Sequence, residues 1–324
     1  MRKNVVALGE LLIDFTESGR SSQGNPLLEA NPGGAPCNVL AMLSKLDTAT
    51  AFIGKVGKDQ FGIMLKKRVS EMGIDTTYLY EDEKVHTTLA FVHTYEDGDR
   101  DFSFYRNPGA DMMLTEKEIP QELIKTANIF HFGTLSMTHE GVRAATKKAV
   151  QIAKNGGGLI SFDPNLRPPL WESLSLAKDQ VAYGLENCDI LKISDNEIQW
   201  FTGKEDYDEG VAYLKEQYQI PLIVLSMGKD GSRAYYGEYC VEEKSFLQKN
   251  TIETTGAGDT FGACILKYVL DHGLDSLTWE GLHEMLLFAN AAASIVTTRK
   301  GALCVMPERA EIEALIEECG RGQK

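Results

Sequence analysis

The chain has 324 residues, of which 43% are hydrophobic and 25% charged, so it can bury a sizeable core as one large soluble domain. Its formal net charge of −14 would repel a polyanion and disfavours nucleic-acid binding, although backbone N–H groups can still hold a phosphate-bearing ligand locally. The six cysteines form no CxxC pair, and neither Cys nor His has the spacing of zinc ligands, which favours reduced thiols in a cytoplasmic protein.

The first quarter of the chain alternates between strand and helix patterns. The apolar run Val5–Leu8, closed by Gly9, predicts a buried strand. Acidic residues interrupt the apolar stretch soon afterwards, so we expect no signal peptide, and no segment approaches the length of a membrane span. A helix is predicted after the turn 33–38, then a strand over Thr50–Ile53 and an amphipathic helix over Phe61–Met72.

The stretch His86–Arg106 has a different character. Two β-rich runs flank Asp97-Gly98, a dipeptide typical of hairpin turns. We expect this hairpin to form a small covering sheet with residues 11–30, so that segments 11–30 and 86–107 together make a lid.

From residue 129 onward, strand and helix patterns alternate regularly. Strands are predicted over 129–132, 159–162, 190–193 and 222–225, with helical patterns such as Glu140–Lys154 between them. This alternation predicts a parallel sheet with helices on both faces, in a single α/β domain that spans residues 1–324. Ligands of such sheets bind beyond the carboxyl ends of the strands, where the glycine-rich and polar clusters fall.

The strongest chemical signal is the segment TTGAGD at residues 254–259, which opens a helical pattern ending at Gly273. Its glycines can direct backbone N–H groups at an anion beside a helix N-terminus, and Asp259 can accept a proton there. A plain turn with Asp259 as an ordinary helix-terminus residue is the more common interpretation of one such motif alone.

Other clusters are individually ambiguous. The segment NPGGAPCN at 31–38 lets a polyol approach the backbone, or is simply a tight turn. Asp14 follows an apolar strand, and Arg106 and Arg167 end two further β-rich runs, where each side chain either meets a ligand or lies in solvent. The turn 226–231 packs against a nucleotide or is a bare hairpin. The chain has no GxxxxGK[ST] loop and no GxGxxG after the first strand, which argues against a P-loop protein and a dehydrogenase.

Taken together and in this order, the motifs resemble the ribokinase-like (PfkB) carbohydrate kinases from end to end. GGAPCN and TTGAGDTF are similar to the two signatures of that family, and FYRNPGAD, SFDPNLR, LKISDNE and TTRKGA are similar to segments of its fructokinases. The resemblance implies a Rossmann-like α/β/α sandwich with a small β-sheet lid. It also implies transfer of the γ-phosphate of MgATP to the 6-hydroxyl of D-fructose.

Carried over position by position, the resemblance makes Asp259 the catalytic base and the N–H groups of Gly256, Ala257 and Gly258 an anion hole. The sugar side would comprise Asp14, Gly33, Gly34, Asn38, Phe91, Phe104, Arg106 and Arg167. The nucleotide side would comprise Lys192, Ser194, Ser226, Gly228, Gly231 and Asn290, together with Gly256 and Gly258 of the anion hole.

Two positions depart from the family pattern. Glu197 is similar to the acidic residue that organises Mg²⁺ through water, but its motif begins with Ser194 instead of Asn. Glu253 stands where the family usually has Asp, which leaves dependence on K⁺ open.

The apolar face and free edges of a lid sheet invite pairing, so we expect a homodimer. A 2-keto-3-deoxygluconate or riboside kinase of the same family is the alternative of the same class. A sugar or nucleotide sensor without catalysis is the alternative of a different class.

Overall fold

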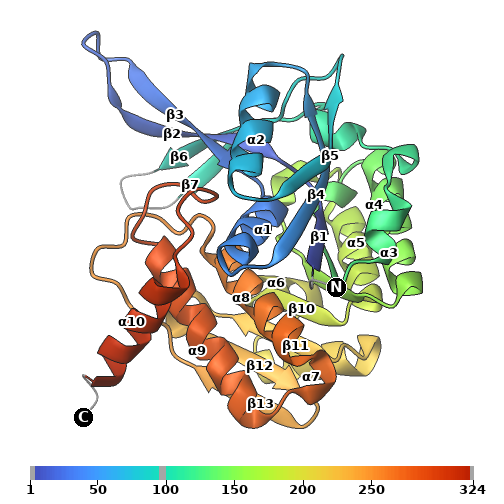
Figure 1. Ribbon diagram of the computed structural model, residues 1–324, viewed down its shortest axis with the longest axis vertical. Helices are drawn as coiled ribbons and strands as arrows, with labels where there is room; N and C mark the ends of the chain where they lie inside the picture. The colour runs from blue at the N-terminus through green and yellow to red at the C-terminus, as the bar shows by residue number, and fades with distance from the viewer. Residues whose placement is uncertain (1–3, 95–99, 322–324) are drawn as a thin grey trace.

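The computed structural model describes residues 4–94 and 100–321, arranged as two sheets with helices packed around the larger one (Figure 1). Among these residues the larger sheet contains, in spatial order, β13 (Tyr239–Glu243), β12 (Ser232–Tyr236), β11 (Leu222–Ser226), β10 (Ile190–Ser194), β9 (Leu159–Asp163), β8 (Ile129–Gly133), β1 (Asn4–Leu8), β4 (Ala49–Gly57) and β5 (Asp75–Asp82). Strands β11 to β5 pair in parallel, whereas β12 and β13 are antiparallel. The predicted parallel sheet is confirmed.

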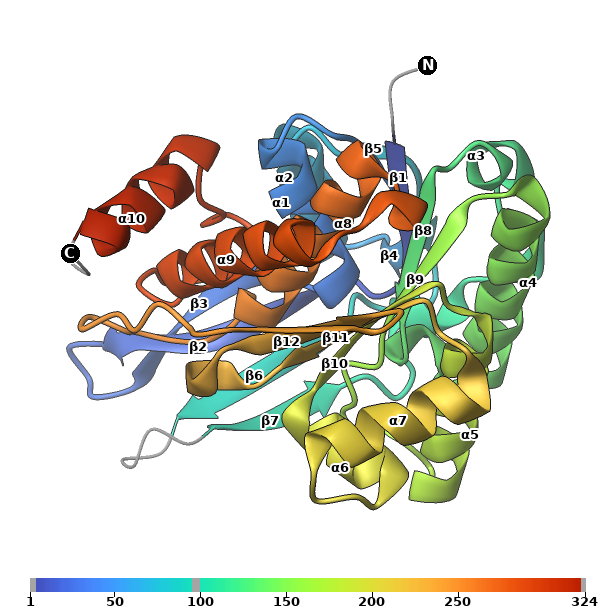
Figure 2. The ribbon, with the colours of Figure 1, turned by 90° about the horizontal axis from the view of Figure 1, so that it is seen from below.

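Helices cover both faces of this sheet (Figure 2). One face carries α1 (Ala35–Lys45), α2 (Gln60–Glu71), α8 (Ala257–His272), α9 (Trp279–Val296) and α10 (Arg309–Arg321). The other carries α3 (Gln121–Lys125), α4 (Glu140–Gly156), α5 (Leu174–Asn187), α6 (Asp195–Thr202) and α7 (Tyr207–Tyr218). No helix within the described ranges is both long and apolar enough to cross a membrane.

Strand β1 shows why these short apolar runs become central strands. Val5 and Ala7 belong to the hydrophobic core on one face of the sheet, and Val6 and Leu8 to the core on the other. Alternate side chains of a strand point to opposite faces, so a strand covered on both sides needs apolar residues at every position. The strands predicted over 5–8, 50–53, 129–132, 159–162, 190–193 and 222–225 are all present.

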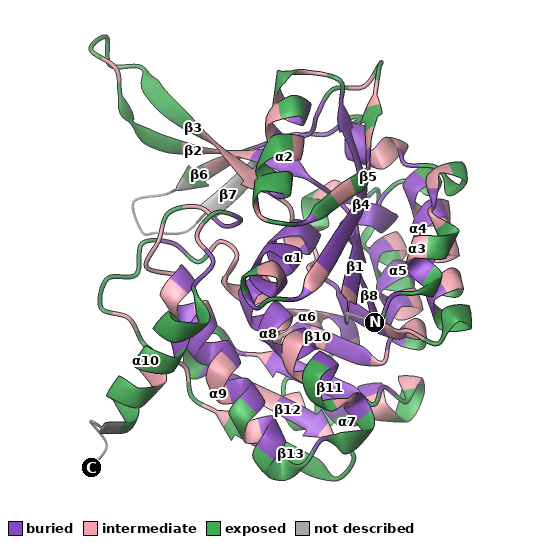
Figure 3. Cartoon of the chain, viewed as in Figure 1, coloured by how far each residue is buried: buried purple, intermediate pink, exposed green. Residues whose placement is uncertain are grey.

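A second, four-stranded sheet stands apart from the core. Its order is β3 (Pro26–Gly33), β2 (Leu12–Arg20), β6 (Leu89–Thr94) and β7 (Arg100–Tyr105). The outer parts of β2 and β3 extend away from the body and are exposed (Figures 1 and 3). The inner ends of β2 and β3 lie beside the first turn of α1. The predicted turn at Asp97-Gly98 lies outside the described residues.

Candidate active site

Helix α8 begins at the glycine-rich turn that the sequence singled out. Gly256 caps the helix with φ 79°, a left-handed conformation that favours glycine, and a Cβ there would lie 2.9 Å from the Cβ of Ala302. The N–H of Ala257 donates to the carbonyl of Thr254 at 3.2 Å, and its part in an anion hole of three N–H groups stays a prediction. The N–H groups of Gly256 and Gly258 are the candidate anion donors at this helix N-terminus.

Asp259, in the first turn of α8, is held by a residue from the other predicted cluster. Asn38, in the first turn of α1, donates from Nδ2 to Asp259 Oδ2 at 2.8 Å. The Oδ1 of Asn38 is buried and accepts no hydrogen bond from the described residues. Because an unpaired buried oxygen is costly, this atom is suited to accept from a ligand hydroxyl.

A cavity of about 370 Å³ opens beside this pair. It collects nine of the predicted residues, namely Asp14, Gly34, Asn38, Phe104, Arg167, Lys192, Gly256, Gly258 and Asp259. It is also lined by Glu10, Leu12, Ala35, Leu135, Asn165, Thr254 and Thr255. We call it the sugar-side cavity, after the chemistry that its carboxylate and amide groups suit.

The register of the second sheet determines which lid residues reach this cavity. Asp14 of β2 pairs with Ala90 of β6, and Ala90 pairs with Phe104 of β7, so all three side chains share one face. Phe91 lies on the opposite face, where its ring stacks on that of Phe15 with centroids 5.0 Å apart. The prediction that Phe91 packs over the sugar ring is therefore wrong, because strand alternation turns its side chain away.

Gly33 does not line the cavity, contrary to the prediction, but it makes room for a residue that does. A Cβ on Gly33 would lie 2.0 Å from Asp14 Oδ2. Gly34 has φ 133°, and a Cβ there would meet the carbonyl of Glu10 at 2.4 Å. The glycine pair thus admits the Asp14 carboxylate and the close turn into α1.

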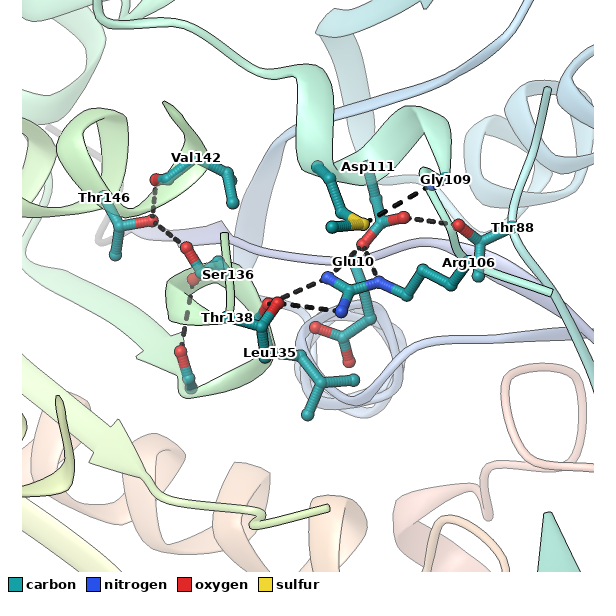
Figure 4. Close-up of polar contacts among 12 residues, drawn as sticks. Glu10, Thr88, Arg106, Gly109, Asp111, Leu135, Ser136, Thr138, Val142 and Thr146 are labelled. Carbon is teal, nitrogen blue, oxygen red and sulfur yellow. Dashed lines mark hydrogen bonds and ion pairs between the residues drawn. The ribbon is translucent and has the colours of Figure 1, made fainter. Parts of the chain in front are cut away.

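Arg106 also lies elsewhere than predicted (Figure 4). Its guanidinium is buried, bonds to Asp111 Oδ2 through Nε at 2.8 Å, and donates to Thr138 Oγ1 and the carbonyl of Leu135. It does not line the sugar-side cavity. Protein acceptors hold the guanidinium in this geometry, so contact between Arg106 and a sugar stays a prediction.

Lys192, on β10, brings positive charge to the floor of the cavity. Its Nζ lies 3.0 Å from Asp163 Oδ2 at the end of β9, and both side chains are largely buried. A Cβ on Gly258 would lie 3.4 Å from the same Nζ, so the ammonium reaches the N-terminus of α8. Burial alone would lower the pKa of Lys192, but the carboxylates of Asp163 and Glu197 outweigh it and raise the pKa.

Several carboxyl groups near the cavity titrate well above their usual range. Burial raises the pKa of Asp14 to about 7 and that of Asp163 to about 6, in each case against the attraction of a nearby cation. Burial also raises the pKa of Asp259, although the Asn38 hydrogen bond, Lys192 and Arg167 oppose it. A carboxylate with a raised pKa is a stronger base, which suits proton acceptance.

A second cavity of about 380 Å³ lies on the other side of the α8 N-terminus. The predicted residues Ser226, Gly228, Gly231 and Asn290 line it, together with apolar side chains such as Phe246. Asn290 accepts from Ser232 Oγ at 3.1 Å and donates to the carbonyl of Glu243, so it also holds the cavity wall. The two cavities share Thr254 and Gly258, so they converge beside Asp259.

Ser194 and Glu197 line neither cavity. They form a capping box at the start of α6, in which Glu197 Oε2 accepts from the N–H and hydroxyl of Ser194, while Oε1 accepts from the N–H of Leu166. The hydroxyl of Ser194 is used in the cap, and the nucleotide contact by Ser194 stays a prediction. Three of roughly four acceptor positions of the Glu197 carboxylate are taken, which fits an ion held through water better than direct ligation.

The sequence reasoning missed Glu10, which lines the sugar-side cavity, and Asp163, which holds Lys192. Each follows a predicted strand at the edge of the sheet where ligands bind, a signal that was applied to Asp14 but not to them. Burial raises the pKa of Glu10 to about 7, and its Oε1 accepts from the N–H of Ala35 at the start of α1.

Comparison with known proteins places this geometry among sugar kinases. Residues 2–309 match the profile of the pfkB family carbohydrate kinases. The chain is 40% identical over 310 residues to the probable fructokinase-2 of Arabidopsis thaliana, covering 95% of this chain and 94% of that protein. It superposes on a fructokinase with bound ATP from Xylella fastidiosa with a TM-score of 0.90 and 28% identity, covering 99% and 100% of the two chains. A fructokinase double mutant from Vibrio cholerae, with fructose, ADP and potassium ion bound, superposes with a TM-score of 0.86 and 27% identity over 97% of this chain and 98% of that chain.

Proposed function

Since the chain belongs to the pfkB family of carbohydrate kinases, we propose that it is a fructokinase that transfers the γ-phosphate of MgATP to the 6-hydroxyl of D-fructose. The observation that carries this proposal is the convergence of two cavities on Gly258, with the Asp259 carboxylate at their junction. One cavity offers the carboxylate and amide groups that suit a polyol, and the other is mainly apolar, as suits a nucleoside.

In the proposed reaction Asp259 accepts the proton of the attacking hydroxyl. The amide of Asn38 donates to Asp259 Oδ2, which leaves Asp259 Oδ1 to accept the proton. As the hydroxyl oxygen forms its bond to the γ-phosphorus, the bond from that phosphorus to the bridging oxygen breaks, and ADP leaves with the electron pair. A raised pKa makes Asp259 a better proton acceptor, and closure of the lid over the cavity would keep competing water away.

The charge on the transferring group is met by fixed donors. The N–H groups of Gly256 and Gly258 and the ammonium of Lys192 lie at the junction, where Asp163 keeps the lysine charged and in place. Such preorganised donors stabilise charge in the transition state without reorganising during the reaction.

The positively charged side chains of the cavity bear on whether the substrate is a neutral sugar or an acid sugar. An acid sugar such as 2-keto-3-deoxygluconate needs a cationic partner, for which Arg106 and Arg167 were the candidates. Arg167 lines the sugar-side cavity, but Arg106 is committed to Asp111 and the ammonium of Lys192 to Asp163. With Asp14, Glu10 and Asp259 also present, the cavity favours hydroxyl groups over a carboxylate.

An ADP-release assay with fructose, ribose, adenosine and 2-keto-3-deoxygluconate tests this assignment. We expect fructose to give the highest kcat/KM, and NMR of the product to show the phosphate on O6. A higher kcat/KM for any of the other substrates would reject fructose as the substrate, and absence of ADP release with all of them would favour a sensor.

For the ions, we propose Mg²⁺, held through water by Glu197, as the partner of the nucleotide phosphates. When bound, it would neutralise phosphate charge. We also propose that Glu253 alters the dependence of the reaction on K⁺. Its buried side chain accepts a hydrogen bond from the N–H of Gly301 at 2.7 Å. Titrating each ion against initial rate separates the two roles.

The second sheet is proposed to act as a lid over the sugar-side cavity and as a dimer interface. The face opposite the cavity carries the stacked Phe15 and Phe91, of which Phe15 also packs against Phe61 of α2, and Leu27, Leu28 and Tyr105 are exposed. Burying such apolar surface against a second copy would stabilise a dimer; a monomeric mass by light scattering would argue against it. A cytoplasmic location is proposed because all six cysteines are free.

A further inference from the structure

Both ends of the β6–β7 hairpin meet one buried carboxylate. Thr88 immediately precedes β6, and Arg106 immediately follows β7. Thr88 Oγ1 donates to Asp111 Oδ1, while Arg106 Nε and Nη2 lie 2.8 and 2.7 Å from Asp111 Oδ2. Asp111 belongs to the short helix η1 (Ala110–Met113), which is not part of the sheet. It therefore bonds both ends of the hairpin to a segment outside the lid (Figure 4).

The same arginine continues into the wall of the sugar-side cavity. Its Nη1 donates to Thr138 Oγ1 at 2.8 Å, and its Nη2 donates to the carbonyl of Leu135 at 2.9 Å. Leu135 lines the cavity, as does Phe104, two residues before Arg106. The Arg106 guanidinium therefore bonds to one residue of the cavity wall, Leu135, and Arg106 follows another, Phe104, by two positions in the chain.

The surroundings leave little room for this arrangement to shift. The side chains of Arg106 and Asp111 are each 2% exposed. A Cβ on Gly109 would lie 1.8 Å from Thr88 Oγ1 and 2.8 Å from Asp111 Oδ1, so only glycine fits against the pair. A planar guanidinium with several fixed acceptors holds its neighbours in one geometry, which a flexible ammonium cannot reproduce.

We propose that Arg106 and Asp111 form a buried anchor that positions Phe104 and Leu135 at the sugar-side cavity, and thereby controls sugar affinity without either residue contacting the sugar. This inference rests on the proposed fructokinase function for its kinetic consequence, but its structural part does not. The alternative roles are a direct contact between Arg106 and the sugar, and a purely structural ion pair.

The kinetic test compares Asp111→Asn, Arg106→Lys and the milder Thr88→Val, which leaves the ion pair in place. We expect the first two to raise the KM for fructose by about 10- to 100-fold through small misplacement of the cavity wall, with a smaller rise for Thr88→Val. The KM for ATP should stay within about twofold of the wild type, because neither Arg106 nor Asp111 lines the second cavity, whereas partial unfolding would lower the apparent kcat instead. Glu242→Gln, which breaks a hairpin ion pair with Arg233 elsewhere in the molecule, is the matched control and should leave both values unchanged.

Hydrogen exchange provides the readout that needs no substrate. Amides of residues 89–93 and 103–105 should exchange faster in Asp111→Asn and Thr88→Val, while those of β1 and β9 keep wild-type rates. If the KM for fructose rises in Arg106→Lys but not in Asp111→Asn, the proposal is overturned in favour of direct contact between Arg106 and the sugar. Unchanged exchange in the hairpin, or an equal rise in both KM values, would also overturn it. If wild-type protein fails to phosphorylate fructose, the proposed function falls, and hydrogen exchange still decides whether the anchor exists.

Discussion

Asn38 Nδ2 lies 2.8 Å from Asp259 Oδ2, a hydrogen bond between residues 221 positions apart in the chain. It joins the first turns of α1 and α8, so the two glycine-rich segments of the sequence meet at one carboxylate. Neither segment alone distinguishes a site from a turn. Their contact gives Asp259 a fixed orientation at the junction of the two cavities.

Replacing Asp259 with Asn removes the proton acceptor while keeping the shape of the side chain. We expect kcat to fall by about 10²- to 10⁴-fold, the usual contribution of a positioned general base. ATP affinity, measured by calorimetry, should be largely retained. Asp271→Asn, near the other end of α8 where Lys267 holds the side chain, is the control and should retain wild-type kcat. Unchanged turnover in Asp259→Asn would reject the base assignment.

Replacing Asn38 with Leu should shift the pH profile of the reaction. The amide of Asn38 stabilises the charged form of Asp259, so its loss should raise the pKa of that carboxyl beyond the rise that burial already causes. The base must be deprotonated to act, so the acidic limb of log kcat against pH should move to higher pH. A lower plateau with the limb unmoved would show that Asn38 only positions the sugar.

Replacing Gly33 with Ala tests how the Asp14 carboxylate is accommodated. The new Cβ would lie 2.0 Å from Asp14 Oδ2, so the carboxylate has to move. The KM for fructose should rise by about tenfold or more, as expected for a misplaced binding group. Gly262→Ala, on α8 where a Cβ would meet open space, should leave the KM unchanged.

The sequence predicts the central sheet well because strands covered on both faces carry long apolar runs, as in β1. It also identifies Asn38 and Asp259, because each lies in the first turn of a helix that begins at a glycine-rich turn. It does not reveal that Arg106 turns toward Asp111, since that choice depends on acceptors contributed by Thr138 and Leu135, about 30 residues away. The facing of Phe91 likewise depends on the register of β6 against β2, which alternation alone does not determine.

Enlarging Ala293 should affect the nucleotide without affecting the sugar. Ala293 lines the second cavity and not the sugar-side cavity. Ala293→Leu should raise the KM for ATP by about tenfold, because added methylenes compete with the nucleoside for a space of about 380 Å³. The KM for fructose at saturating ATP should be unchanged. A parallel rise of both values would show that the two cavities are not separate subsites.

The raised pKa of Asp14 makes the sugar-free protein less stable as pH rises. Burial raises this pKa from 3.8 to about 7, so between these values the folded state binds more protons than the unfolded state. By linkage, the free energy of unfolding decreases with pH across that window, and the contribution of Asp14 is fully present only at lower pH. Asp14→Asn should therefore be more stable than the wild type at pH 8, by at most about 4 kcal/mol for a shift of about 3 pKa units, and about equally stable at pH 4.

Urea unfolding at both pH values measures this difference, and Asp59→Asn provides a control of opposite sign. Burial alone would raise the pKa of Asp59, but hydrogen bonds from Thr87 and Gly62 outweigh it and lower the pKa. The contribution of Asp59 is therefore present above its unfolded pKa and lost as pH falls, so Asp59→Asn should be less stable than the wild type at pH 8.

Fructose should stabilise the wild type much more than Asp14→Asn, since ligand binding to the folded state adds to its stability. Equal stability of Asp14→Asn and wild type at pH 8 would mean that solvent already hydrates the carboxylate, and that its sugar-free form carries no desolvation cost.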